Sequence, residues 1–268
     1  MCVCCTQNAV SSLFHRQPGT ERKEQMRLYQ LYRLTLHDLR MSSAVRGTGI
    51  LWSIAEPVLL TGTLWAVMHL LVQAPPEGAI PYSFWFTAGY LPWQFFQRSV
   101  SESANVLRKH AYLLRQAQPP VRLLPLLPVC SSLLIHLLLL LLLGGILERT
   151  QTAVSPDLLL LTRVVADLIL FTTGISAALS VLSVLVPWVK GLTGTLLQIW
   201  FWVTPVAWRM GRPDFVRINP LCGIVAGYRR ALLAADGGAE VPEGVCLAVF
   251  AAGILCFERY RGEIADAL

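Results

Sequence analysis

The chain has 268 residues, of which 54% are hydrophobic and only 14% charged, and its mean hydropathy is +0.55. A soluble domain usually carries about a quarter charged residues, so this composition argues against an ordinary soluble enzyme or binding module. It indicates one helical membrane domain, because the leucine run at 133–147 lacks the alternation of a membrane β-strand.

The net charge of +6 and the seven cysteines give no sign of a bound ligand. Nucleic-acid binding could account for the charge, but Lys and Arg also accumulate on the cytoplasmic side of membrane proteins, and we favour that interpretation. Cys2, Cys4 and Cys5 have no histidine or further cysteine pair at ligand spacing, and the other four stand singly. We therefore expect no metal site and no nucleic-acid partner.

The N-terminal region is predicted to lie outside the membrane core. Residues 1–23 are mostly polar and are expected to form a mobile cytoplasmic tail. Residues 24–46 place leucines and tyrosines on one helix face and arginines on the other, the pattern of an amphipathic helix in the headgroup plane. Leu34 is the exception, because it falls on the charged side.

Residues 47–268 are predicted to form a six-helix transmembrane domain, which makes the chain an all-α membrane protein. Trp52 opens the first span as an interfacial anchor. The segment 205–240 is expected to form short helices at the membrane surface between the fifth and sixth spans, and a polar tail follows residue 257. The expected spans are 50–72, 82–106, 123–147, 158–186, 192–208 and 241–257.

The distribution of Lys and Arg sets the expected orientation. Seven of them precede the first span and four lie in the connector 107–122, whereas the first outer loop holds none. The positive-inside rule therefore places both termini in the cytoplasm. Five arginines between positions 209 and 230 oppose this orientation, because it places them outside.

Two pairs of opposite charge lie within expected spans. Arg98 and Glu102, and likewise Arg163 and Asp167, stand four residues apart, which lets each pair meet on one helix face. We interpret them as self-neutralising pairs, with a conduit lining as the alternative. His136, alone among leucines, is expected to be a packed residue rather than a proton relay.

No catalytic motif is evident in the sequence. It lacks the G-x-x-x-x-G-K-[ST] loop that binds ATP phosphates, and it has no G-x-S-x-G or H-E-x-x-H motif. We expect no catalytic residues and no cofactor in this chain, so the energy for any transport comes from another protein. An integral-membrane transferase is the enzymatic alternative, and it would have to use Arg163, Asp167 and His136.

Three separated blocks resemble the type-2 ABC exporter permeases that export polysaccharides. They are "LRMSSAVRGTGILWSIAEPVL" (39–59), "FTAGYLPWQFFQRSVSESANVL" (86–107) and "IWFWVTPVAWRM" followed by "RINPLCGIVAGYRRALL". The likeness runs from Arg40 to the C-terminus and favours the capsule branch slightly, with O-antigen and teichoic acid exporters as alternatives. An exporter of a small drug or lipid would share the architecture. The turn at 187–191 departs from the family, since Lys190 is its only charge.

The resemblance implies a homodimer in the inner membrane of a bacterium, joined to two ATPase subunits that bind Mg-ATP. It also implies a lipid-linked polysaccharide as substrate and allows a periplasmic co-polymerase or adaptor. The segment 108–118 would be the coupling helix seated in the ATPase. Its expected contact residues are Arg108, Lys109, His110, Tyr112, Arg115 and Gln116.

The remaining site residues implied by the resemblance fall into three groups. Arg33, Arg40, Arg46 and Trp52 would gather the lipid headgroup. Re-entrant turns would form at Thr204, Pro205, Asn219, Pro220, Tyr228 and Arg229. The conduit candidates are Trp200, Phe201, Trp202, Trp208, Arg98 and Arg209, and an interfacial aromatic belt is an equal alternative for the tryptophans.

Overall fold

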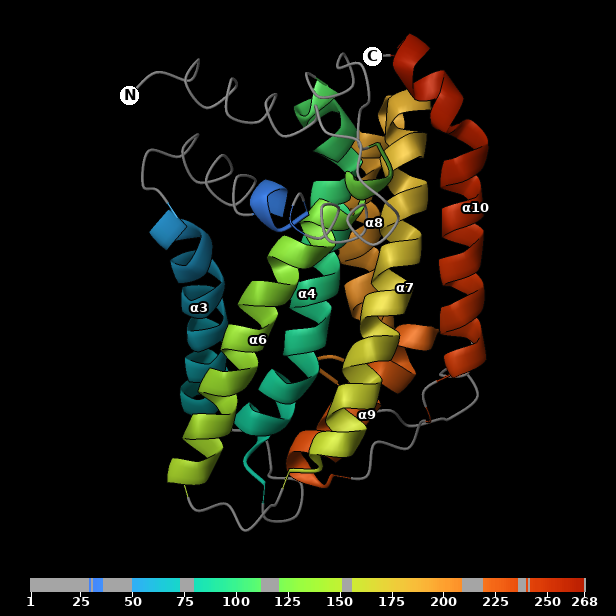
Figure 1. The fold of residues 1–268 in the computed structure, drawn as a ribbon. Helices are drawn as coiled ribbons and strands as arrows, with labels where there is room; N and C mark the ends of the chain where they lie inside the picture. The colour runs from blue at the N-terminus through green and yellow to red at the C-terminus, as the bar shows by residue number, and fades with distance from the viewer. Residues whose placement is uncertain are drawn as a thin grey trace.

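The computed structural model of the protein describes residues 29, 31–35, 50–72, 80–111, 121–150, 156–208, 219–235, 240 and 242–267. The regular elements in these ranges are helical, as expected of an all-α protein (Figure 1). They are α3 (Ile50–Val67), η2 (Met68–Val72), α4 (Tyr82–Lys109), η3 (Val121–Leu123), α6 (Leu126–Arg149), α7 (Leu158–Leu185), α8 (Trp188–Val203), α9 (Pro220–Leu233) and α10 (Glu243–Ala267).

The long helices run alternately up and down between two ends of a bundle (Figure 1). Helices α4, α7 and α10 finish at the end where α6 and α8 begin. The short helix α9 lies at the other end, near the start of α7, where the Asp157 N–H donates to the Ala231 carbonyl over 2.8 Å. We call this second end the α9 end.

Two helical stretches, Val121–Arg149 and Leu158–Leu185, are long and apolar enough to cross a bilayer, and Ile54–Leu70 is a shorter apolar helix. Helix α4 has 28 residues, but its polar and charged positions make it less apolar than these. Helix α8 has 16 residues, or about 24 Å, against about 30 Å of hydrocarbon. The number of six membrane crossings stays a prediction.

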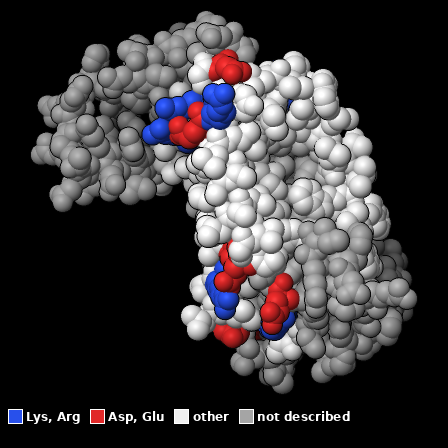
Figure 2. Space-filling model, turned by 90° about the vertical axis from the view of Figure 1, so that its right-hand side faces the viewer, with Lys and Arg blue, Asp and Glu red and all other residues white. Residues whose placement is uncertain are grey.

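Charged residues on the face formed by α10 lie towards the two ends of the molecule, and the band between them is uncharged (Figure 2). Helix α10 carries Glu243 at the α9 end and Glu258, Arg259 and Arg261 near its other end, with no charge in residues 244–257. Such an uncharged belt between charged rims is what a bilayer requires, because a charge near its centre costs about 3 kcal/mol.

Helix α4 is the centre of the bundle, because side chains on nearly all its faces are buried. It packs against α6, α7, α8 and α9. Its Trp93 and Phe96 are 2% and 0% exposed, and the Phe96 ring stacks on Phe171 of α7 with centroids 5.7 Å apart. The helix continues through Pro92, so the second expected span forms one continuous element.

Helices α7 and α10 form the most extensive pair in the described part of the chain. Gly174 and Gly253 meet where they cross, and a Cβ atom placed on Gly174 would lie 2.6 Å from the Cα atom of Phe250. A Cβ atom on Gly253 would in turn collide with the backbone of Gly174. The absence of side chains at both positions is therefore what allows the two backbones to approach so closely.

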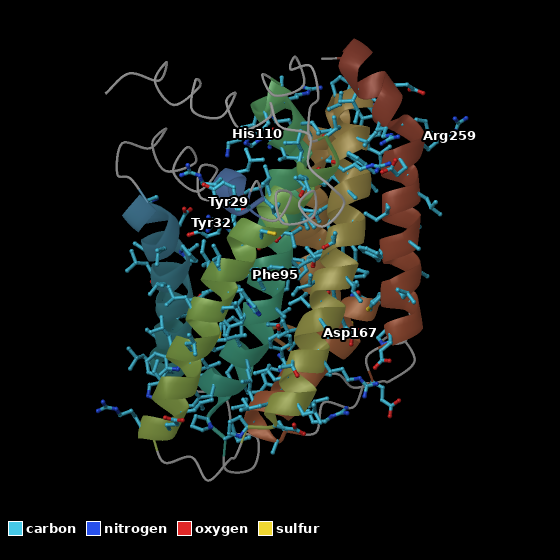
Figure 3. All side chains as sticks on the ribbon, viewed as in Figure 1. Tyr29, Tyr32, Phe95, His110, Asp167 and Arg259 are labelled. Atoms are coloured by element: carbon cyan, nitrogen blue, oxygen red, sulfur yellow. The ribbon has the colours of Figure 1, made fainter. Side chains whose placement is uncertain are left out.

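The described part of the N-terminal segment, residues 29 and 31–35, differs from the predicted pattern at Leu34. Leu34 is 5% exposed and belongs to the buried apolar cluster that includes Leu107 of α4 and Leu127 of α6, although the sequence pattern placed it on the charged side. Tyr29 and Tyr32 are 47% and 60% exposed, so the face on which they were expected points away from the bundle (Figure 3). Contact with the bundle, which periodicity does not show, determines the buried face. The rest of the segment 24–46 and the tail 1–23 lie outside the described residues.

Two further boundaries differ from those expected. The fifth expected span starts earlier, since α8 begins at Trp188, and it stops at Val203 instead of reaching 208. The polar tail after residue 257 is part of α10, which stays helical through Ala267. An ion pair of Glu258 with Arg122, whose closest atoms are 2.7 Å apart, and another with Arg261 support this extension.

Candidate functional site at the interrupted aromatic helix

Among the described residues, helix α8 has one apolar side that no other element covers. Only Thr193 and Leu197 are buried, where the helix contacts α4 and α7. A stripe of large apolar side chains runs along its exposed side at spacings of three and four residues, as expected of one helix face. Its members are Trp188, Leu192, Leu196, Ile199 and Trp202, between 44% and 66% exposed.

The chain leaves the helix at Thr204-Pro205, and side chains satisfy the backbone carbonyls around the break. Thr204 is extended, with φ −89° and ψ 132°, and Pro205 has no N–H to continue the ladder. The Trp208 indole N–H donates to the Trp202 carbonyl over 3.0 Å, and the Tyr82 hydroxyl donates to the Ala207 carbonyl. Buried carbonyls without partners would destabilise the fold, so these donors make the interruption possible.

Arg229 of α9 supplies two further donors to the carbonyls around the break. Its Nη1 and Nη2 atoms donate to the carbonyls of Pro205 and Val206 over 2.9 and 2.7 Å. Its Nε atom donates to the Trp85 carbonyl over 3.2 Å, and its Cζ atom lies 3.4 Å from the centroid of the Trp85 ring. The side chain is only 4% exposed, so this arginine serves the backbone of the fold rather than a surface ligand.

Asn219 joins the two sides of the break. Its Oδ1 atom accepts from the Leu221 N–H over 3.1 Å, which caps α9, and Pro220 occupies the first helical turn, where its missing N–H costs nothing. The same oxygen accepts from the Trp200 indole over 3.2 Å, and Nδ2 donates to the Thr204 hydroxyl over 3.0 Å. Of the residues predicted at re-entrant turns, the structure thus joins Asn219 to Thr204 and Arg229 to Pro205, whereas Tyr228 has a different partner.

Tyr228 connects α9 to α6. Its hydroxyl lies 2.8 Å from His136 Nε2, and both side chains are buried, at 0% and 2% exposure. The ring of Phe95 on α4 packs on the same histidine with centroids 5.3 Å apart. Sequence reasoning expected a packed residue at His136 but had no signal for its partner, which lies 92 positions away.

The predicted conduit aromatics divide into two pairs. Trp200 and Phe201 point into the bundle, where their centroids lie 5.2 Å from Phe96 and 5.4 Å from Trp93 respectively. Trp202 and Trp208 are 65% and 37% exposed. Of these four residues, only the second pair is exposed in the described part of the chain.

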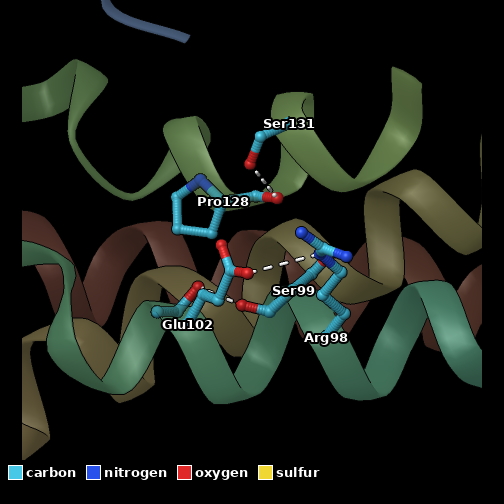
Figure 4. A network of polar contacts seen from close by, with 6 residues as sticks. Arg98, Ser99, Glu102, Pro128 and Ser131 are labelled. Carbon is cyan, nitrogen blue, oxygen red and sulfur yellow. Dashed lines mark hydrogen bonds and ion pairs between the residues drawn. The ribbon is translucent and has the colours of Figure 1, made fainter. Parts of the chain in front are cut away.

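The charged pairs within the bundle have different partners. Arg98 meets Glu102 on α4 with Nε and Oε1 3.3 Å apart, as the spacing predicted, beside the Ser131–Pro128 turn of α6 (Figure 4). Arg163 instead forms its ion pair with Glu243 at the start of α10. Asp167 is 7% exposed and lies farther along α7 (Figure 3). Glu243 of α10 is the ion-pair partner of Arg163 in place of Asp167 on the same helix, so the predicted Arg163–Asp167 pair is wrong.

The coupling residues are only partly described. Arg108 and Lys109 are exposed in the last turn of α4, and Arg108 Nη2 donates to the Ser183 carbonyl of α7 over 3.1 Å. His110 ends the helix and is 2% exposed, with Nδ1 3.0 Å from the Val106 carbonyl (Figure 3). The start of the expected segment 108–118 is therefore a continuation of α4. Tyr112, Arg115 and Gln116 lie outside the described residues.

The headgroup candidates show a similar division. Arg33 is exposed, with its Cζ atom 5.6 Å from the centroid of the Tyr29 ring, and Trp52 is 39% exposed in the first turn of α3. Both positions suit contact with an interface. Arg40 and Arg46, and the conduit candidate Arg209, lie outside the described residues.

No protein-family model matches the sequence. Among curated proteins, the chain is 27% identical over 218 residues to the O-antigen export system permease protein RfbA of Myxococcus xanthus, covering 75% of this chain and 81% of the relative. It is 23% identical over 207 residues to the protein of the same name from Klebsiella pneumoniae, covering 75% and 78%.

A helical bundle with an uncharged belt on its α10 face and two strongly apolar helices indicates a membrane protein. The two relatives confirm the resemblance to type-2 ABC exporter permeases. Both are named as permeases of an export system, which supports a transport component rather than an enzyme. Neither name supports the capsule branch that the sequence pattern favoured.

Proposed function

We propose that this chain is the membrane-spanning subunit of an ABC exporter that moves a lipid-linked polysaccharide across the inner membrane, driven by a separate ATPase. The observation that carries the proposal is the similarity to two O-antigen export permeases over three quarters of the chain. Because both relatives carry that name, we propose a polymer of the O-antigen kind in place of a capsule.

The orientation follows from charge. The connector 107–122 carries four Lys or Arg residues and joins α4 to α6 at the end where α10 finishes (Figure 1). The positive-inside rule makes this the cytoplasmic end. An ATPase would bind there, and α9 with the break at 204–205 would lie at the outer side, as re-entrant elements.

The uncovered face of α8 favours a homodimer. A helix that buries two side chains on its own bundle and exposes an apolar stripe from Trp188 to Trp202 requires lipid or protein on the other side. We propose that two copies face each other across this stripe and that the polymer passes between them. The exposed faces of Trp202 and Trp208 would then meet sugar rings.

The structure gives the enzymatic alternative no support. A transferase would need Arg163, Asp167 and His136 to act together at one interface. In the structure Arg163 pairs with Glu243, and His136 bonds to Tyr228 on another helix. Arg163 and His136 are thus engaged with residues of two different helices, α10 and α9.

Deletion of the gene in its native bacterium tests the proposal. We expect loss of O-antigen from the cell surface and accumulation of the lipid-linked polymer inside, measured by electrophoresis of lipopolysaccharide and by extraction of lipid-linked sugar. Supplying this chain should restore export only when the ATPase gene is intact. Loss of capsule with normal O-antigen would reassign the substrate, and unchanged surface polymers would refute the proposal.

A further inference from the structure

The guanidinium of Arg229 occupies a space that exists because residue 89 is glycine. Gly89 lies on α4 one turn after Trp85, whose carbonyl and ring both contact Arg229. A Cβ atom on Gly89 would lie 2.9 Å from Arg229 Cζ, closer than real Cβ contacts, and closer still to Nη2. An alanine at this position would therefore push the guanidinium away from its acceptors.

The same guanidinium joins three segments: its own helix α9, helix α4 and the chain after α8. It binds a carbonyl of α4, at Trp85, and two consecutive carbonyls beyond the end of α8, at Pro205 and Val206. A planar fork of donors can hold such a set rigidly, whereas a lysine ammonium on a flexible stem cannot. Because Pro205 interrupts the helical ladder, side-chain donors hold the chain at 204–207. Arg229 shares this role with Asn219, which donates to the Thr204 hydroxyl, and with Tyr82, which donates to the Ala207 carbonyl.

We propose that Arg229 is a positioning residue that holds the interrupted segment 204–207 against the start of α4, an arrangement that we call the lock. Gly89 leaves the space that the Arg229 guanidinium occupies. Arg229 acts on the transport path through the backbone and does not contact the polymer. The inference rests on the proposed function only for its export readout, since the lock itself is a property of the fold and can be measured on purified protein.

A cysteine reporter at Val206 measures the lock directly. Val206 is 0% exposed, and its carbonyl is the acceptor of Arg229 Nη2. In purified protein carrying Val206→Cys, the reporter cysteine should react slowly with a polar maleimide. The same protein without the reporter cysteine gives the background labelling, which is subtracted. Adding Gly89→Ala should raise the reaction rate about tenfold, the factor expected for loss of one buried hydrogen bond.

Two comparisons separate the lock from general disturbance. Gly145→Ala on α6, where a Cβ atom meets nothing within 4 Å, should leave the reporter protected. In an Arg229→Lys background, Gly89→Ala should change the reaction rate by less than about twofold, because the forked group that it displaces is gone. Arg229→Lys alone should give an intermediate rate, because one ammonium replaces part of the donor set.

Export provides the second readout. Gly89→Ala should reduce polymer export about tenfold per folded chain, and Gly145→Ala should not. Equal effects of Gly89→Ala on reporter labelling in the Arg229 and Arg229→Lys backgrounds would overturn the proposal, as would a reporter that stays protected in both. If the parent chain exports no polymer but the labelling pattern holds, the proposed function fails and the lock stands.

Discussion

Gly253→Ala is expected to destabilise the protein by about 3 kcal/mol, with a fall in Tm of about 5 °C or more in detergent. A methyl group at this position would collide with the backbone of Gly174 at the crossing of α7 and α10. Backbone atoms cannot move aside as a side-chain end can, so the two helices must separate along their length. Thermal unfolding followed by circular dichroism measures the change.

Gly262 on the same helix provides the matched control. A Cβ atom there meets nothing within 4 Å, so Gly262→Ala should keep or raise stability, by up to about 1 kcal/mol from helix propensity. If Gly253→Ala lowers the stability and Gly262→Ala raises it, the need for glycine on α10 lies at its crossing with α7. If both variants unfold at the parent temperature, the close approach of α7 and α10 is wrong.

Trp200→Ala and Trp202→Ala are expected to act on different properties, although the two residues are almost adjacent. Trp200 packs edge-on against Phe96 and Phe171 and donates to Asn219, so its truncation should cost about 3–5 kcal/mol. Trp202 is 65% exposed, so its truncation should change stability by less than about 1 kcal/mol. Under the proposed function, Trp202→Ala should instead reduce polymer export.

Trp202→Phe serves as the control for ring contact, because it keeps a flat apolar face. Export measured per folded chain should follow the order parent, Trp202→Phe, Trp202→Ala, while thermal stability stays nearly constant. A loss of stability in Trp202→Ala as large as that in Trp200→Ala would contradict the division of the aromatic residues. Normal export in Trp202→Ala would remove this residue from the path.

The sequence was sufficient to predict those helices that continuous apolar runs indicate. The leucine-rich stretch and the run from Leu158 predicted α6 and α7 closely, because an apolar run of that length has few alternatives to a buried or membrane helix. Interruptions at Thr204-Pro205 and at Asn219-Pro220 were also expected, because proline removes a backbone donor. The structure adds that Asn219 caps α9.

What could not be predicted depends on contacts between distant segments. The spacing of Arg163 and Asp167 suggested a pair, yet Glu243, 80 residues away, takes the arginine. The close approach of Arg229 to Gly89 could not be predicted, because a glycine in a helix can occur for many reasons and does not indicate which distant residue lies beside it. Likewise the burial of Leu34 in the N-terminal helix depends on an apolar cluster that residues of other helices form with it.

The burial of Arg229 also bears on the charge asymmetry. The predicted orientation places five arginines between 209 and 230 on the outer side, against the positive-inside rule. Arg229 donates to three backbone carbonyls and is 4% exposed, so its presence there has a structural reason. One of the five residues that oppose the orientation is thereby accounted for without a polymer contact.

Reconstitution into liposomes tests the central claim, that this chain forms the path but does not power the transport. Lipid-linked polymer is incorporated into liposomes that contain the chain alone or the chain with its ATPase, and its appearance on the far side is followed with added ATP. The account predicts transport only when the ATPase and ATP are both present. Sustained accumulation of polymer against its gradient by the chain alone, with or without ATP, would contradict it.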